Sequence, residues 1–192
     1  MPRLFVALDL PDTAKRQLEP LTGGLALPDV RWLPPEQWHL TLRFIGEVEG
    51  GVLYDVGEAL AEVPGRPFDL RLKGIGHFPP RGEPKVLWAG VERNAELTAL
   101  KRRIDRALRD AGLPPDPRRF APHVSLARFR QLPPPNRLGA YLMRHSLFQG
   151  EPFPVSGFRL YSSVLRPDGP VHAVEAEYDL VPGMHGDDEG GW

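Results

Sequence analysis

The sequence predicts an α+β protein made of two pseudo-symmetric lobes, each with an antiparallel sheet and outer helices. Its 192 residues suffice for one large core or two small packed lobes. The order strand, helix, loop, strand occurs twice, and a long repeat with only two members favours paired lobes over a solenoid. Strands alternate with helices, and several are joined by turns of hairpin length, which is typical of α+β folds.

The first repeat begins with an alternating segment, Arg3–Leu10, which predicts a half-buried strand. Asp12 is placed to cap a following helix. Three apolar residues share one face of that helix: Ala14, Leu18 and Leu21. After a proline-rich loop, His39–Ile45 alternates again and predicts a second strand.

The second repeat has the same order. Val86–Val91 predicts a strand, and Asn94 can cap a helix that keeps helical spacing of its apolar residues as far as Gly112. A loop rich in proline and arginine follows. His123–Phe129 then alternates and predicts the closing strand of the repeat.

The remaining segments complete the two lobes. Between the repeats we expect a helix over Val52–Val63 and a strand over Phe68–Lys73. After the second repeat we expect a helix over Asn136–Phe148, then a strand over Phe153–Val164 that forms a hairpin with residues 174–180. We expect residues 1–181 to form a single bilobal domain and residues 182–192, which lack periodicity, to be a mobile tail.

Composition excludes several classes of protein. Lys and Arg together number 24 against 25 Asp and Glu, so no excess of positive charge marks a protein that coats nucleic acid, and an anionic substrate must be held locally. The absence of cysteine excludes disulfides, thiolate zinc sites and a cysteine nucleophile. No apolar run approaches the roughly 18 residues of a membrane span, and the N-terminus lacks the pattern of a secretory signal, so we expect a cytoplasmic protein without membrane contact.

Two short motifs carry the chemical signal: His39-Leu40-Thr41-Leu42 and His123-Val124-Ser125-Leu126. Side chains alternate along a strand, so each histidine and the hydroxyl two residues later point the same way. If the lobes are related by a pseudo-twofold axis, two imidazoles and two hydroxyls face one cleft and can hold a phosphate. The plainer alternative is that both histidines are half-buried strand residues bonded to neighbouring carbonyls.

On these motifs the chain resembles the two-histidine (2H) phosphoesterases, and within them the RNA 2′,3′-cyclic phosphodiesterases, also called 2′-5′ RNA ligases. The resemblance extends from RLFVALDL through WHLTLRFIGEV and APHVSLARF to the closing FRLYSSVLRPDGPVHAVEAEYDL, with Ser125 where threonine is commoner. It implies a bilobal fold with a central cleft and hydrolysis of a 2′,3′-cyclic phosphate to a 2′-phosphomonoester, without a metal or other cofactor. It also implies that His39 donates a proton to the leaving 3′ oxygen and that His123 is the base for water.

Hydrolysis of a cyclic phosphodiester needs a base for water and an acid for the departing oxygen, and two histidines supply both near pH 7. Thr41 and Ser125 would donate hydrogen bonds to the nonbridging oxygens. By resemblance, Arg128 binds the substrate through its base or its phosphate, although strict alternation puts it on the face opposite His123. A twist, a bulge or the end of the strand would have to place Arg128 on the face of His123.

For several other residues the sequence leaves more than one role open. Phe5 either stacks on a base or packs between the lobes. Arg43 shares the face of His39 under strict alternation, where a surface salt bridge is the plainer account. Arg118 and Arg119 either add positive potential for RNA or lie in a solvated loop. We expect the remaining histidines to be surface or turn residues: His77, His145, His172 and His185.

Three alternatives stay open. The same site could join a 2′,3′-cyclic end to a 5′-hydroxyl through a 2′-5′ bond, or it could bind RNA ends without turnover. A metal-dependent hydrolase is a third possibility, although neither motif has ligands at metal-binding spacing. The expected partner is RNA with a 2′,3′-cyclic phosphate terminus or a cyclic nucleotide. We expect no obligate protein partner and a monomer, because two lobes already complete one site.

Overall fold

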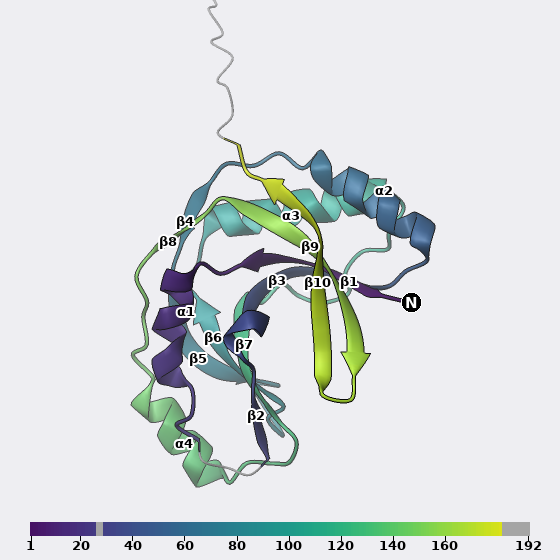
Figure 1. Ribbon diagram of the computed structural model, residues 1–192. Helices are drawn as coiled ribbons and strands as arrows, with labels where there is room; N and C mark the ends of the chain where they lie inside the picture. Colours follow the sequence, from purple (N-terminus) through teal and green to yellow (C-terminus); the bar gives the residue numbers. More distant parts are fainter. Residues whose placement is uncertain (26–28, 182–192) are drawn as a thin grey trace, which may run out of the picture.

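A computed structural model describes residues 1–25 and 29–181 of the chain (Figure 1). The described part contains one large antiparallel sheet, in the order β10 (Gly169–Asp179), β9 (Gly157–Arg166), β1 (Arg3–Asp9), β3 (His39–Glu47), β7 (His123–Phe129), β6 (Val86–Val91) and β5 (Leu72–Phe78), with β2 (Val30–Trp32) beside β7. The two lobes meet where β3 pairs with β7 through Leu40 and Val124. The predicted α+β fold with antiparallel strands in both lobes is confirmed.

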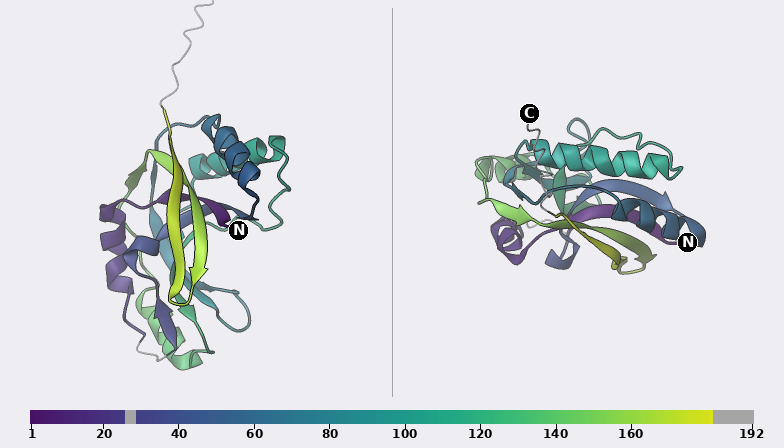
Figure 2. Two further views of the ribbon diagram at one scale, coloured as in Figure 1. Left: turned by 45° about the vertical axis from the view of Figure 1, so that its right-hand side comes forward. Right: turned by 90° about the horizontal axis from the view of Figure 1, so that it is seen from above.

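The helices gather in two pairs, with α2 (Gly50–Ala61) beside α3 (Ala95–Asp110) at one end and α1 (Asp12–Leu18) near α4 (Pro135–Arg144) at the other (Figures 1 and 2). Helix α1 follows β1 but lies near α4, which follows β7. Helix α3 follows β6 but packs against α2 and β3. In each repeat, the helix that follows the first strand therefore packs in the other lobe (Figure 1).

One hydrophobic core runs through both lobes. It includes Leu18 of α1, Leu40 of β3, Ile104 of α3 and Val124 of β7. The helix exchange explains this continuity, because α1 and α3 carry apolar faces from one repeat into the other.

Strand β1 is buried on both faces, so the prediction of a half-buried strand is wrong. Its even-numbered residues belong to the main core, and Phe5 and Ala7 pack with Tyr161 on the other face. The cause is the central position of β1, which pairs with β3 on one side and β9 on the other.

Several predicted boundaries need correction. Asp12 is the first residue of α1 and not its cap, since Pro11 holds that position and its carbonyl accepts from the Ala14 N–H at 3.0 Å. Helix α4 ends at Arg144, before the predicted Phe148. Asn94, by contrast, caps α3 as predicted, with its Oδ1 accepting from the Leu97 N–H at 3.0 Å.

Two predicted strands are each divided. Phe68–Lys73 splits into β4 (Phe68–Leu70) and the start of β5, and Phe153–Val164 splits into β8 (Phe153–Val155) and β9. The cause is a separate small sheet in which β4 and β8 pair with each other. The hairpin of β9 and β10 is confirmed.

Two further points concern the chain ends and membranes. The predicted tail, residues 182–192, lies outside the described residues. Within the described part, no helix is long and apolar enough to cross a membrane.

Candidate active site between the lobes

Strand β3 carries a β-bulge within its histidine motif. Thr41 and Arg43 pair with consecutive residues of β1, which leaves Leu42 as an extra residue. An insertion of this kind reverses the alternation of faces beyond it. Phe44 therefore lines the same cleft as His39, and the prediction that Arg43 shares that face is wrong.

Strand β7 carries a bulge at the equivalent position. Ser125 and Ala127 pair with consecutive residues of β6, which leaves Leu126 as the extra residue. The bulge therefore places Arg128 on the same face of β7 as His123. A role of Arg128 in substrate binding requires this placement. Phe44 and Arg128 each lie five residues after the histidine of their motif, so they are equivalents in the two repeats.

These side chains line a cleft of about 750 Å³. Strands β1, β3 and β10 contribute Phe5, His39, Thr41, Phe44 and His172, and strands β2, β5 and β7 contribute Arg31, Phe78, His123, Ser125 and Arg128. The structure thus brings all six predicted site residues to one hollow. Two histidines and two hydroxyls from equivalent strands provide the hydrogen-bond donors and the proton-transfer groups that binding and cleavage of a phosphate ester require.

His39 is packed among other rings. Its imidazole stacks on Phe5, with ring centroids 5.0 Å apart, and meets His172 edge to face at 5.5 Å. Burial lowers the pKa of His39 to about 4, and the nearby charge of His172 adds to the lowering. A hydrogen bond with the backbone of Gln37 acts in the opposite direction. The imidazole of His39 is therefore neutral near pH 7 when the cleft is empty.

His123 has a defined tautomer. Its Nδ1 lies 2.7 Å from the carbonyl oxygen of Ala121, and because a carbonyl only accepts, Nδ1 carries the hydrogen and Nε2 carries the lone pair. Burial lowers the pKa of His123, the bond to Ala121 opposes this, and the charge of Arg128 adds to the lowering. The alternative of histidines bonded to neighbouring carbonyls thus accounts for one ring nitrogen, while the side chain still lines the cleft.

The two phenylalanines near His39 differ in exposure. Phe5 is only 4% exposed and stacks between His39 and Tyr161, the latter at 5.1 Å, which favours a packing role for Phe5. Phe44 is 50% exposed, and the guanidinium of Arg118 lies 5.1 Å from its ring centroid. An alignment of the two motifs on their histidines could have indicated Phe44 from the sequence, because Phe44 then matches Arg128.

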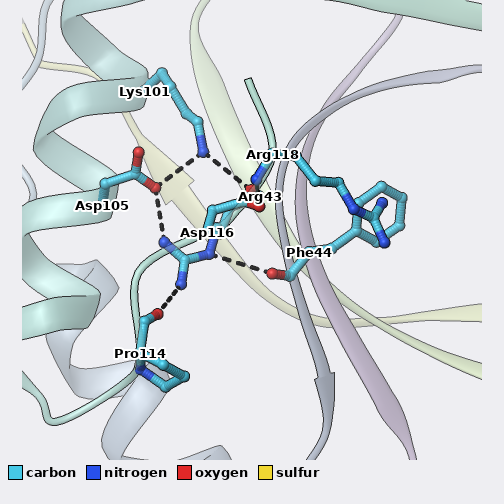
Figure 3. A network of polar contacts seen from close by, with 7 residues as sticks. All are labelled: Arg43, Phe44, Lys101, Asp105, Pro114, Asp116 and Arg118. Atoms are coloured by element: carbon cyan, nitrogen blue, oxygen red, sulfur yellow. Dashed lines mark hydrogen bonds and ion pairs between the residues drawn. The ribbon is translucent and has the colours of Figure 1, made fainter. Parts of the chain in front are cut away.

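Arg43 forms a buried polar network behind the cleft (Figure 3). It forms the expected salt bridge but is 4% exposed, so the expectation that this bridge lies at the surface is wrong. Its Nη1 lies 2.9 Å from Asp105 of α3, and Asp105 also binds Lys101 at 2.9 Å. Arg43 further donates to the carbonyls of Phe44 and Pro114. The network therefore joins β3, α3 and the loop that carries Arg118.

The other histidines divide into two groups. His172 lines the cleft beside His39, so the expectation of a surface or turn residue is wrong for it, and no spacing in the sequence indicated this. His77 bonds to the Pro79 carbonyl and His145 packs on Tyr141, both outside the cleft. His185 lies outside the described residues.

The charge of the cleft is uniformly positive. Among its described lining residues are four arginines and no carboxylate: Arg3, Arg31, Arg118 and Arg128. Arg119 is not among the lining residues. Over the described part of the chain, no group of three or more His, Asp or Glu side chains is placed to hold a metal ion. The lining is suited to an anion, although the chain as a whole has a net charge of −1.

Comparison with known proteins gives one consistent result. A family model described as LigT like Phosphoesterase matches residues 8–88 and 90–172. A protein of Thermus thermophilus is 36% identical over 193 residues, covering 96% of this chain and 92% of the relative. One of Archaeoglobus fulgidus is 33% identical over 171 residues, covering 88% and 96%. Both relatives are named RNA 2′,3′-cyclic phosphodiesterase.

Solved structures share the fold. The crystal structure of a Thermus thermophilus protein superposes with a TM-score of 0.76 at 31% identity, covering 93% of this chain and 97% of that one. The structure of Escherichia coli LigT complexed with 3′-AMP superposes with a TM-score of 0.75 at 22% identity, covering 95% and 100%.

Proposed function

The chain belongs to the LigT-like phosphoesterase family, and we propose on this basis that it hydrolyses 2′,3′-cyclic phosphates at RNA ends to 2′-phosphomonoesters. The observation that carries the proposal is the pair of equivalent strands that present His39, Thr41, His123 and Ser125 to one cationic cleft. The names of the relatives agree with it.

In the proposed reaction, His123 removes a proton from water, and the oxygen of that water attacks phosphorus. The bond from phosphorus to the 3′ oxygen breaks, and His39 gives a proton to that oxygen. The 2′ ester bond remains, which yields the 2′-phosphomonoester. His39 then ends neutral and His123 protonated, so exchange with solvent restores the starting state.

Hydroxyl and guanidinium groups stabilise the phosphate in this scheme. Thr41 and Ser125 donate to the nonbridging oxygens, and Arg128 supplies a fixed positive charge. Phe5 stacks on the imidazole of His39 and so fixes the orientation of that ring. The anionic substrate raises the pKa of the buried His39, so the proton that His39 donates is taken up when substrate binds.

The proposal is tested with purified protein in EDTA and an oligoribonucleotide that ends in a 2′,3′-cyclic phosphate. We expect a 2′-phosphate end, and a loss of roughly 10²- to 10⁴-fold in kcat/KM for His39→Ala and for His123→Ala. His77→Ala, which lies outside the cleft, serves as the control and should match the unmodified protein.

The alternatives have distinct outcomes in the same experiment. A 2′-5′ joined product in the presence of a 5′-hydroxyl oligonucleotide would support ligation. Binding without any product would support an RNA-end binding module. Activity that is lost in EDTA and returns with added metal would contradict the metal-free mechanism.

A further inference from the structure

His172 of strand β10 lies beside the imidazole of His39. Its ring meets the His39 ring edge to face at 5.5 Å and the Phe5 ring in the same way at 5.1 Å. Within residues 1–25 and 29–181, the buried Nδ1 of His172 has no hydrogen-bond partner. Strand β10 lies at the edge of the sheet and pairs with β9. The position of the His172 ring therefore depends on how β10 is held over the cleft.

Gln37 joins β10 to the segment that carries His39. Its side-chain Nε2 donates to the Pro170 carbonyl at 3.3 Å, two residues before His172 in β10. The backbone of Gln37 forms a hydrogen bond with the imidazole of His39. All four residues line the cleft. Gln37 thus contacts the imidazole on one side and the strand of its neighbour His172 on the other.

The backbone of Gln37 is itself fixed. Pro35–Gln37 forms a 3₁₀ turn, in which the Gln37 N–H donates to the Pro34 carbonyl at 2.9 Å and the Trp38 N–H to the Pro35 carbonyl at 3.1 Å. The two prolines have restricted φ angles, and Trp38 is 2% exposed. The bond to Pro170 therefore restrains β10 against a rigid support.

Arg31 restrains the same hairpin farther from His172. Its Nη2 donates to the Asp168 carbonyl at 3.1 Å, in the turn that precedes β10. Pro170 is nearer to His172 along the chain than Asp168 is. The bond from Gln37 is therefore the one that restrains the part of β10 beside His39.

In the second repeat, alanine takes the place of Gln37. Ala121 stands two residues before His123, as Gln37 stands two residues before His39. The Ala121 carbonyl accepts from the His123 Nδ1 at 2.7 Å, but its methyl side chain has no group that could bond to another strand. The side-chain bond to a neighbouring strand is therefore a feature of the first repeat.

We propose that Gln37 is a positioning residue for His39. By anchoring β10 at Pro170 it keeps His172 against the imidazole, so that His172 and Phe5 together fix the orientation of the ring. The proposal rests on the proposed function, in which His39 gives a proton to the leaving oxygen. Displacement of a reacting group by about 1 Å can cost roughly 10²-fold in rate. The loss of the Gln37 side chain should therefore slow the chemical step more than it weakens binding.

Gln37→Met tests this, because methionine has a similar length but no donor for the Pro170 carbonyl. With the oligoribonucleotide that ends in a 2′,3′-cyclic phosphate, we expect kcat to fall roughly tenfold and KM to change by less than about twofold. Gln131→Met makes the same substitution at an exposed residue beyond β7 that does not line the cleft, and it should match the unmodified protein. A cooperative thermal transition verifies that Gln37→Met is folded.

NMR titration of the His39 imidazole gives a second readout that needs no substrate. The charge of His172 lowers the pKa of His39, so release of β10 in Gln37→Met should let that pKa rise. In His172→Gln the charge is already absent, and the addition of Gln37→Met should then cause a much smaller rise.

Other charged and titratable groups surround His39 from neighbouring elements and are the same in all these variants. They are His123 of β7, Lys15 of α1, Asp9 of β1 and Tyr161 of β9. A difference between the variants in the pKa of His39 therefore reports the place of His172.

Three results would overturn the inference. One is a raised KM with little change in kcat in Gln37→Met, which would place Gln37 on the substrate. Another is an unchanged kcat or an unchanged pKa of His39. The third is an equal rise of that pKa with and without His172. If the unmodified protein shows no hydrolysis, the proposed function fails, whereas the titrations still decide whether Gln37 positions His172 against His39.

Discussion

His39 and His123 hold equivalent positions on two strands, yet their surroundings differ. His39 packs on Phe5 and His172, whereas His123 meets Phe78 edge to face at 4.8 Å and lies near the charge of Arg128. Identical residue types in a repeated unit thus acquire unequal proton affinities from their neighbours.

The pKa values of both histidines are lowered, which predicts an acidic optimum. The reaction needs one imidazole protonated and the other neutral, and that form is most populated between the two pKa values. The pKa of His39 is about 4 and that of His123 lies below its usual value near 6.5. We expect the kcat/KM profile of the free enzyme to be bell-shaped with its maximum below about pH 6.5. A profile that is flat from pH 5 to pH 9 would contradict the acid and base pair.

His172 contributes to the low pKa of His39 through its charge. In His172→Gln the neutral side chain removes this repulsion, so the pKa of His39 should rise. The shift is measured by NMR titration of the His39 imidazole, and His77→Gln should leave that titration unchanged. A fall in the pKa of His39, or no change, would show that the charge of His172 does not reach it.

At the scale of elements, the two bulges and the buried network decide which side chains enter the cleft. Each bulge adds one residue between the hydroxyl and the side chain five residues after the histidine, which is Phe44 in β3 and Arg128 in β7. The bulge in β3 sends Arg43 to the opposite face, where it meets Asp105 of α3. Packing of α3 on β3 and presentation of Phe44 to the cleft are therefore linked.

This link makes Asp105 important for stability. In Asp105→Asn, the buried guanidinium of Arg43 and the buried ammonium of Lys101 lose their shared carboxylate. We expect the free energy of unfolding to fall by about 1–3 kcal/mol, measured by urea denaturation. Asp110→Asn on the same helix is the control, because Asp110 is exposed and its ion pair is with the exposed Arg109, so the change should stay within about 0.5 kcal/mol. Equal effects of the two substitutions would contradict a structural role for the network.

At the scale of the whole molecule, the exchanged helices make the lobes interdependent. Helix α1 and helix α3 each complete the core beside elements of the other repeat. We propose accordingly that residues 1–181 form one domain, and that a single chain acts as a monomer because it supplies both histidine motifs.

Division of the chain at the exposed turn between β5 and β6 tests this. We expect fragments 1–82 and 83–181 to show no cooperative thermal unfolding alone, because each lacks a helix that its sheet needs. Mixing the fragments should restore a cooperative transition, and the uncut chain 1–181 should unfold as the full chain does. A cooperative transition in either isolated fragment would contradict the interdependence of the two halves of the chain.

The sequence by itself determined the repeated order of elements, the α+β class and the two histidine motifs. These features depend on local alternation, helical spacing and capping, which neighbouring residues set. Asn94 and the β9–β10 hairpin are examples, since both rest on residues within a few positions of each other.

Only the tertiary structure decided the rest of the site. The bulges in β3 and β7, the burial of Arg43, the place of His172 beside His39 and the pairing of Arg31 with Arg128 all join segments far apart in the chain. A bulge is defined by a mismatch with a partner strand, and burial depends on which other segments cover a side chain. Neither can therefore be predicted from the periodicity of one segment.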